Sequence, residues 1–292
     1  MAHTVRNSLA LAAIVGGVYA LAPSAPERHL PEVPAVTAPD ASGVLVVDLV
    51  DGASEADLES IERILHADLD WTSPHSIDEA LAQGQVADLD DALEALRGNP
   101  LVEVAEPMMQ MSIPAEAIAI HGGGEAAGAF PNDPMYARQW NMKAMGAPEA
   151  WAAGAMGDGV IVAVVDTGVS KIEDLEGTRL LEGASFVPGA KTAADDQGHG
   201  SHVAGTIAQT TNNGIGCAGV APYATILPVK VLSGSGSGSS AQVAAGIDWA
   251  VDQGAQVINL SLGSGLYSAV IHVAVRKARR AGVVVVAAAG ND

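Results

Sequence analysis

The sequence predicts an α/β protein, in which a doubly wound, mostly parallel sheet with helices on both faces is preceded by a small α+β domain. Two observations carry this prediction. In the second part of the chain, apolar runs typical of buried strands alternate with segments of helical periodicity. An Ala- and Gly-rich stretch over residues 115–130 separates that part from an earlier, more acidic pattern. Alternating strands and helices are typical of a parallel sheet that is covered on both faces.

The main domain is expected over residues 131–292. Its predicted strands cover residues 160–165, 225–231, 256–260 and 283–288. Its predicted helices cover residues 199–210, 240–252 and 268–280. The last strand, VVVVAAA, shows no alternation of polar and apolar residues, as expected for a strand that is buried on both faces.

The first domain is expected over residues 42–114. It opens with the strand GVLVVDLV and closes with the strand LVEVAEP. Between them lie two helical segments, SEADLESIERILHADL, in which Ser54 is placed to cap the helix, and DLDDALEALRGNP. A strand, two helices and a closing strand predict a small split-βαβ, or ferredoxin-like, domain.

The residues before the first domain are typical of export and linkage. Arg6 precedes a mostly apolar run that ends at the small-x-small site Ala20-Leu21-Ala22, so residues 1–22 predict a signal peptide and a secreted protein. Pro23 and Pro26 would hinder cleavage there, which leaves a retained membrane anchor as the alternative. The proline-rich residues 23–41 predict a linker, and residues 115–130 predict a connector with a processing site.

The charge of the chain is unevenly distributed. Residues 1–130 hold 21 Asp and Glu against 4 Lys and Arg, a net charge of −17, whereas residues 131–292 hold 13 against 10, a net charge of −3. The acidic part would repel phosphate and no basic stripe offsets it, so we expect no nucleic-acid partner. The single cysteine, Cys217, excludes an internal disulfide and is typical of a small buried side chain.

Three polar residues lie at the ends of predicted strands or helices, in positions that suggest a catalytic site. Asp166 ends the strand in GVIVAVVDTGV, His199 lies between two glycines in DDQGHGSHVAGTIA, and Asn291 follows the last strand. The carboxyl ends of parallel strands meet at one edge of the sheet, where ligands bind. Taken singly, each has a simpler interpretation: an aspartate that caps a turn, a histidine packed in the core, and an asparagine that forms a turn.

The ordered motifs VVDTGV, GHGSHVAGTIA, SLG and VVVAAAGN together resemble the subtilisin-like serine peptidases, or subtilases, from about residue 131 to the end of the chain. The resemblance implies that Asp166 orients an imidazole, that His199 transfers the proton, and that Asn291 stabilises the oxyanion. The pattern selects His199 and not His202, because the motif fails when it starts at His202.

The nucleophile of that family does not occur in this sequence. It is a serine in a Gly-Thr-Ser-Met-Ala-type helix start, and the serines in SGSGSGSS and SLGSG have a different context. We therefore expect the chain to be a truncated form of a longer peptidase precursor, with the catalytic serine absent and no turnover by residues 1–292.

The resemblance also implies a substrate cleft and an inhibitor. Two short segments would pair with an extended peptide or protein substrate, namely Gly236, Ser237 and Gly238, and Ser261, Leu262 and Gly263. Backbone pairing of this kind tolerates many side chains. The domain at residues 42–114 resembles the inhibitor-like propeptides of the family, which cover the catalytic sheet and leave after cleavage near the connector.

A structural calcium site is the remaining implication of the resemblance. Its ligands would be the side chains of Asp133, Asp174 and Asn213 and the carbonyl groups of Thr210, Ile215 and Cys217. An all-oxygen set of this kind suits Ca²⁺. The segment IEDL around Asp174 is one residue shorter than the related pattern and lacks its usual His-Pro.

The sequence thus predicts a secreted, calcium-stabilised subtilisin-like serine endopeptidase precursor. The alternative is a nucleophile-free domain that binds peptides or its own propeptide without cutting them. A third hypothesis, a nucleotide-binding α/β protein, rests on VLSGSGSGSS, which lacks the Gly-Lys-Ser/Thr ending and the G-x-G-x-x-G spacing. A membrane contact is expected only if the signal segment is retained.

Overall fold

The computed structural model describes residues 43–74, 76, 80–113 and 130–290. The predictions of a signal peptide over residues 1–22 and a linker over residues 23–41 lie outside the described residues, as do Asn291 and all of the predicted connector except Phe130. Among the described residues, none of the helices is both long and apolar enough to cross a membrane.

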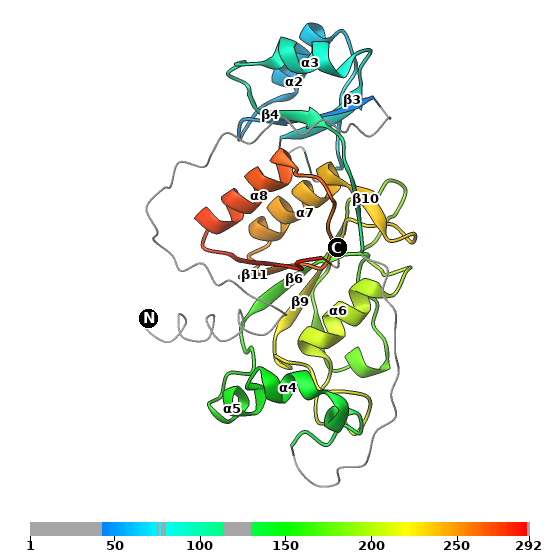
Figure 1. Ribbon diagram of the computed structural model, residues 1–292, viewed down its shortest axis with the longest axis vertical. Helices are drawn as coiled ribbons and strands as arrows, with labels where there is room; N and C mark the ends of the chain where they lie inside the picture. The colour runs from blue at the N-terminus through cyan, green and yellow to red at the C-terminus, as the bar shows by residue number, and fades with distance from the viewer. Residues whose placement is uncertain (1–42, 75, 77–79, 114–129, 291–292) are drawn as a thin grey trace.

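The first domain has the predicted split-βαβ topology (Figure 1). In chain order its elements are β1 (Val44–Leu49), α2 (Glu55–Leu65), β2 (Asp70–Trp71), β3 (Leu81–Gln85), α3 (Leu89–Leu96) and β4 (Val102–Pro107). The sheet order is β2-β3-β1-β4, and every neighbouring pair is antiparallel. Strands β2 and β3 were not predicted, because β2 is very short and β3, LAQGQ, contains few residues with a preference for strands.

Local sequence explains where helix α2 begins. The hydroxyl group of Ser54 accepts a hydrogen bond from the backbone N–H of Asp57, and a carboxylate oxygen of Asp57 accepts one from the backbone N–H of Ser54 at 2.8 Å. This reciprocal capping box satisfies two N–H groups that the first turn leaves without partners. Leu58 and Ile61 then turn one face of the helix into the core of the first domain.

The main domain is a parallel sheet, as predicted. Its strands are β6 (Ile161–Asp166), β7 (Arg179–Leu180), β8 (Ala184–Ser185), β9 (Thr225–Lys230), β11 (Val257–Leu260) and β12 (Val284–Ala287). The order is β12-β11-β6-β9-β7, and β8 also pairs with β9. All of these pairs are parallel, which places the carboxyl ends of β11, β6 and β9 side by side.

Helices cover both faces of this sheet. The longer ones are α6 (His199–Ala208), α7 (Ser240–Asp252) and α8 (Ala269–Arg280). Shorter helices and 3₁₀ turns precede them: η1 (Tyr136–Arg138), α4 (Trp140–Ala144), α5 (Ala147–Ala152) and η2 (Glu173–Leu175). One buried cluster joins α7 and α8 to one face of the sheet, and a second joins α6 to the other.

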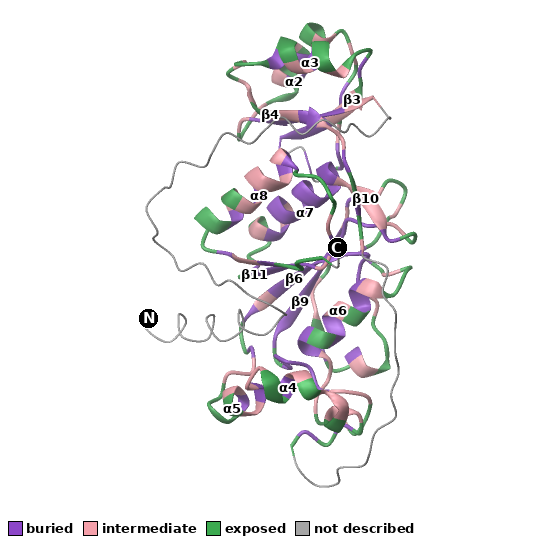
Figure 2. Cartoon of the chain, viewed as in Figure 1, coloured by how far each residue is buried: buried purple, intermediate pink, exposed green. Residues whose placement is uncertain are grey.

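Strand β6 shows why a continuous apolar sequence was needed for this arrangement. Ala163 and Val165 belong to the cluster under α7 and α8, whereas Val162 and Val164 belong to the cluster under α6. Successive side chains of a strand point to opposite faces, so a strand covered on both faces must be apolar at every position. Figure 2 shows the buried strands β6 and β9 between the helices.

The first domain packs on α7 and α8 through its sheet (Figure 1). In β1, Leu45, Val47 and Leu49 face the core of the first domain, and Val46 belongs to the cluster that contains α7 and α8. The opening strand therefore carries apolar residues on both faces, because its second face is covered by the main domain. The short strand β5 (Gln110–Ser112) follows β4 and pairs with β10 (Ser237–Ser239) of the main domain.

Candidate active site

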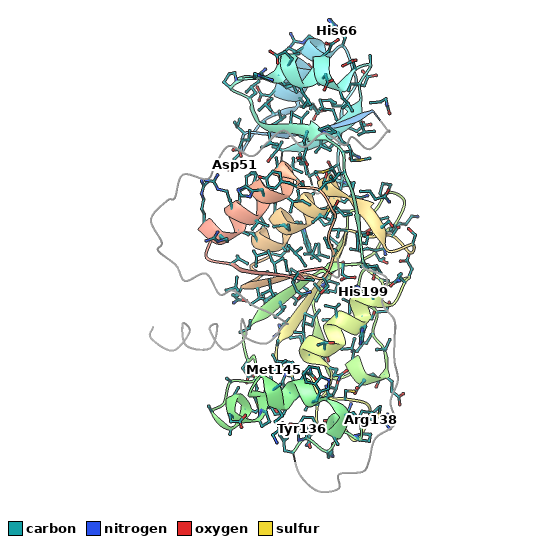
Figure 3. All side chains as sticks on the ribbon, viewed as in Figure 1. Asp51, His66, Tyr136, Arg138, Met145 and His199 are labelled. Carbon is teal, nitrogen blue, oxygen red and sulfur yellow. The ribbon has the colours of Figure 1, made fainter. Side chains whose placement is uncertain are left out.

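The structure brings together Asp166 and His199, which are 33 residues apart in the chain. Asp166 is the last residue of β6 and is completely buried, and His199 is the first residue of α6. The Nδ1 atom of His199 lies 2.8 Å from Oδ1 and 3.0 Å from Oδ2 of Asp166. A carboxylate at this position fixes the ring orientation and stabilises an imidazolium ion, so the pair can serve as a general base. Figure 3 shows His199 at the start of α6.

Glycines allow the helix to begin so close to the end of the strand. After Asp166 the chain turns at Gly168, which has a φ of 104° that other residues rarely adopt. A Cβ atom on Gly200 would collide with the carbonyl oxygen of Gly168 and lie 3.2 Å from the Cβ of Asp166. The glycine that follows His199 therefore allows the contact between the imidazole and the carboxylate.

Asp195, which the sequence analysis did not single out, links the turn after Asp166 to the first turn of helix α6. Its Oδ1 accepts hydrogen bonds from the Thr167 hydroxyl and from the backbone N–H groups of Gln197 and Gly198, at 2.8–3.0 Å. Its Oδ2 accepts hydrogen bonds from the N–H and the hydroxyl group of Ser201. Burial favours a higher pKa for Asp195, but the hydrogen bonds from Gly198, Ser201 and Gln197 outweigh it and lower the pKa.

Lys230 is a second residue that the sequence analysis missed. It pairs with Asp166 in the parallel register of β6 and β9, and only 1% of its surface is exposed. Its ammonium group donates hydrogen bonds to the carbonyl groups of Thr167 and Leu232 and to the carboxylate of Asp196. A lone lysine within the apolar run ILPVKVL was the available signal, because a buried ammonium group requires partners.

The two predicted substrate-binding segments lie on either side of β5. Ser237 and Gly238 pair with Ser112 and Met111 in an antiparallel register, and the N–H of Ile113 donates to the carbonyl group of Gly236 at 3.1 Å. On the other side, Ser112 and Gly263 exchange two backbone hydrogen bonds, of 3.1 and 3.0 Å. An extended strand from the chain itself thus lies between these two segments.

The strand ends explain why these two segments lie near Asp166 and His199. Strand β6, which ends at Asp166, lies between β11 and β9. The segment 261–263 follows β11 directly, and the segment 236–238 follows β9 after a short turn. Both segments therefore leave the sheet at the edge where Asp166 meets His199.

Glu106 of β4 binds the first turn of helix α8. Its carboxylate accepts a hydrogen bond from the Ser268 hydroxyl at 2.8 Å and one from the Ala269 N–H at 2.6 Å. Burial raises the pKa of Glu106, and these hydrogen bonds oppose that rise. The contact joins the first domain to the main domain a few residues before β5 in the chain.

The predicted calcium ligands come together at one loop. Asp133 accepts hydrogen bonds from the N–H groups of Asn212 and Asn213, and Asp174 accepts them from the side-chain amide of Asn213 and from the N–H of Cys217. The backbone N–H of Thr210 donates to the carbonyl group of Asp174. Two carboxylates therefore converge on the loop 210–217.

One ligand of this set has an unexpected orientation. Asn213 presents its Nδ2 to Asp174 at 2.9 Å, whereas its Oδ1 accepts a hydrogen bond from the N–H of Ile215. The residue types fit a calcium ion, but the Asn213 amide must turn before its oxygen can join the two carboxylates. Among the described residues, no group of three or more His, Cys, Asp or Glu side chains is placed to hold a metal.

His202 and Cys217, which the sequence analysis also considered, lie outside the contact between Asp166 and His199. His202 lies on the exposed face of α6, three residues after His199. Cys217 is partly buried, and burial raises the pKa of its thiol, which opposes formation of a nucleophilic thiolate. The predicted oxyanion donor, Asn291, lies outside the described residues.

Comparisons with known proteins relate the second part of the chain to one family. The Subtilase family profile matches residues 157–292. The chain is 51% identical over 153 residues to Subtilisin Savinase from Lederbergia lenta, a match that covers 52% of this chain and 55% of that protein. It is 48% identical over 163 residues to Thermitase from Thermoactinomyces vulgaris, covering 55% of this chain and 58% of that protein. The chain thus spans little more than half the length of these relatives.

A solved structure matches more of the chain. Fervidolysin from Fervidobacterium pennivorans, described as a keratinolytic enzyme related to subtilisin, superposes with a TM-score of 0.66 and 27% sequence identity. The match covers 86% of this chain and 40% of fervidolysin. Residues 131–292 make up only 162 of the 292 residues, so the match extends into the earlier part of the chain.

Proposed function

Residues 157–292 belong to the subtilase family, and from this premise we propose that the chain is the precursor of a secreted serine endopeptidase with an Asp-His-Ser triad. The observation that carries the proposal is the buried Asp166–His199 pair beside a cleft that binds an extended strand through its backbone. A base held by a carboxylate, next to a site for an extended peptide, is the arrangement that peptide-bond hydrolysis by a serine nucleophile uses.

In the proposed reaction, the base is Nε2 of His199, because Nδ1 is held by Asp166. It takes the proton of the attacking serine Oγ as that oxygen adds to the carbonyl carbon of the substrate, and it then gives the proton to the leaving amine. Water hydrolyses the resulting acyl-enzyme by the same route. The nucleophile would be a serine beyond residue 292, and the side-chain amide of Asn291 would donate to the oxyanion.

The first domain is proposed to act as an intramolecular inhibitor, or propeptide. Support comes from β5, which occupies the position that an extended substrate would take between residues 236–239 and 261–263. Release would then require separation of the first domain after cleavage in the connector at residues 115–130. Because the contacts of β5 in the cleft are mostly between backbone groups, we expect substrates with varied side chains.

Calcium is proposed as a structural ion at Asp133, Asp174 and Asn213, with the carbonyl groups of Thr210, Ile215 and Cys217. The support is the convergence of two carboxylates on the loop 210–217. When bound, the ion would neutralise these two charges and tie the segment around Asp133 to that loop. Secretion is proposed from the pattern of residues 1–22, with a retained membrane anchor as the alternative.

A direct test uses the chain with and without a downstream segment that carries a Gly-Thr-Ser-Met-Ala-like sequence. The longer protein should cleave casein and be labelled by a fluorophosphonate, whereas residues 1–292 should do neither, because a base needs an attacking oxygen. In the longer protein, His199→Ala should lower kcat by at least about 10⁴-fold, the scale found for triad residues of serine peptidases, subtilisin included. His202→Ala is the matched control and should have a far smaller effect.

The competing function is a peptide-binding domain without a nucleophile, which the backbone pairing of β5 also favours. A gene that continues past Asp292 without such a serine motif would support it. Stoichiometric labelling and peptide hydrolysis by pure residues 1–292 would contradict the binding function and the placement of the serine beyond residue 292, and would require a different nucleophile.

A further inference from the structure

The contact between the two domains buries a carboxylate from each of them. In β1, Asp48 lies two residues after Val46 and therefore on the same face, which is turned toward α7 and α8. Only 4% of Asp48 is exposed. From the other side, Asp248 of α7 is 8% exposed, and its Oδ1 has no hydrogen-bond partner among the described residues.

One cation lies among these acids. The Nζ atom of Lys277 on α8 is 3.8 Å from Oδ1 of Asp48 and 3.1 Å from Oδ1 of Asp51, which follows β1. Figure 3 shows Asp51 between the first domain and α8. We call this region the acidic junction, and the charged groups that form it are Asp48, Asp51 and Glu103 of the first domain and Asp248, Asp252 and Lys277 of the main domain.

The acidic junction holds five carboxyl groups and one ammonium group. Removing two carboxylates from water is costly unless each is paired or hydrogen-bonded, and a single lysine cannot fully compensate both. Burial raises the pKa of Asp48 to about 7 and that of Asp248 to about 7, although Lys277 lowers both. Burial opposes the charge on Lys277 itself, but Asp48 and Asp248 outweigh it and raise the pKa of the lysine.

We propose that the acidic junction is a proton-dependent contact: protonation of the Asp48 and Asp248 carboxyl groups holds the first domain on α7 and α8, and their ionisation as pH rises weakens this docking. The ligand of the site is a proton. The docking equilibrium does not require peptidase activity. Its consequence for catalysis, the release of β5 from the cleft as pH rises, rests on the proposed function.

The sign of the effect follows from proton linkage. When the domains separate, Asp48 and Asp248 face water and return toward the ordinary aspartate pKa of 3.8. The docked state therefore binds more protons. Docking is strongest below about pH 3.8, weakens as pH rises from there to about 7, and changes little above pH 7. Each proton changes the docking constant by up to about tenfold per pH unit within this window.

Glu106 must be separated from this effect, because it also crosses between the domains and its pKa is also raised by burial. It differs from Asp248 in having hydrogen-bond partners, the Ser268 hydroxyl and the Ala269 N–H. A Glu106→Gln variant removes its titration and leaves the acidic junction intact.

The test is amide hydrogen exchange on the whole chain between pH 5.5 and pH 8, corrected for the intrinsic exchange rates. The reporters are the N–H groups of Ser112, Ile113, Ser240 and Gly263, whose hydrogen bonds join the two domains. Amides of β6 and β9 report global unfolding. Protection of the reporters should fall by at least about tenfold as pH rises, relative to the β6 and β9 amides.

The double variant Asp48→Asn with Asp248→Asn should lose this pH dependence, and Glu106→Gln should keep it. If the double variant fails to fold, the single variants should each show a reduced pH dependence. Lys277→Gln should weaken docking further at pH 8, because it removes the only cation of the acidic junction. Reporter protection that is independent of pH in the wild-type chain, or a full pH dependence in the double variant, would overturn the proposal, whether or not the longer protein is a peptidase.

Discussion

Ser112 and Gly263 exchange two backbone hydrogen bonds, Ser112 N–H to the Gly263 carbonyl at 3.1 Å and Gly263 N–H to the Ser112 carbonyl at 3.0 Å. These residues belong to different domains. Together with the pairing of β5 and β10, this exchange places a strand from the first domain between two segments of the main domain. A strand with partners on both sides has its backbone N–H and C=O groups satisfied as in the interior of a sheet.

This relationship predicts the effect of removing one donor. Ser112→Pro eliminates the N–H that bonds to Gly263, whereas the matched variant Ser112→Ala retains it. An amide hydrogen bond contributes about 0.5–1.5 kcal/mol, so the proline variant should weaken docking of β5 by roughly that amount or more. Amide exchange at Gly263 and Ser240 measures the effect. Equal protection of these amides in the two variants would show that the hydrogen bond does not hold β5 in the cleft.

The close contact at Gly200 predicts a large difference between two glycines of helix α6. Gly200→Ala places a methyl group against the Gly168 carbonyl and should destabilise the domain by at least about 2 kcal/mol, because neither backbone segment can move freely. Gly205→Ala meets only the end of the Gln209 side chain and should be neutral or stabilise the helix by up to about 1 kcal/mol. Urea denaturation of the two variants checks this order, and a reversal would contradict the assigned contact.

The hydrogen bonds of the Asp195 carboxylate lead us to predict a pH-dependent contribution to the free energy of unfolding. Hydrogen bonds lower its pKa in the folded state against the effect of burial, so its stabilising effect is present above the ordinary aspartate pKa of 3.8 and is lost as pH falls below it. Asp195→Asn should therefore reduce the free energy of unfolding at pH 7. The difference in unfolding free energy between this variant and the wild-type chain should become smaller as pH falls through 3.8. A difference in unfolding free energy that stays constant from pH 7 to pH 3 would show that the ionised Asp195 carboxylate does not stabilise the fold.

The two carboxylates at loop 210–217 predict a response to chelation. An ion that binds only the folded state stabilises it by roughly 3 kcal/mol at a hundred times its Kd, so a chelator should lower the Tm. Asp174→Ala should blunt the response, whereas Asp158→Ala, an exposed acid elsewhere on the main domain, should keep it. A Tm that is unaffected by chelator in the wild-type chain would contradict a structural calcium ion.

The periodicity of the sequence and its glycines were sufficient to predict much of the fold. Strands β6, β9, β11 and β12 and helices α6, α7 and α8 lie within about two residues of their predicted positions. These elements have strong local signals, because buried parallel strands are apolar at every position and the helices carry regular apolar faces. The placement of Asp166 at a strand end and His199 at a helix start also follows from local sequence.

Only the tertiary structure revealed the contacts between distant segments. The strand β3, LAQGQ, has a weak local preference and is stabilised by its partners β1 and β2. Asp195 and Lys230 are ordinary polar residues in the sequence, and their importance comes from groups that the fold brings around them.

The sequence by itself thus determined the layers of the main domain through short-range periodicity, and its motifs, through their resemblance to the subtilases, singled out Asp166 and His199 as the proposed catalytic pair. The tertiary structure decided that the His199 Nδ1 and Asp166 Oδ1 atoms lie 2.8 Å apart, that β5 lies between residues 237–239 and Gly263, and that Asp48 and Asp248 are buried near the same lysine. The physical reason is that burial, hydrogen bonding and charge interactions depend on which distant groups become neighbours, and no local pattern of residues specifies those neighbours.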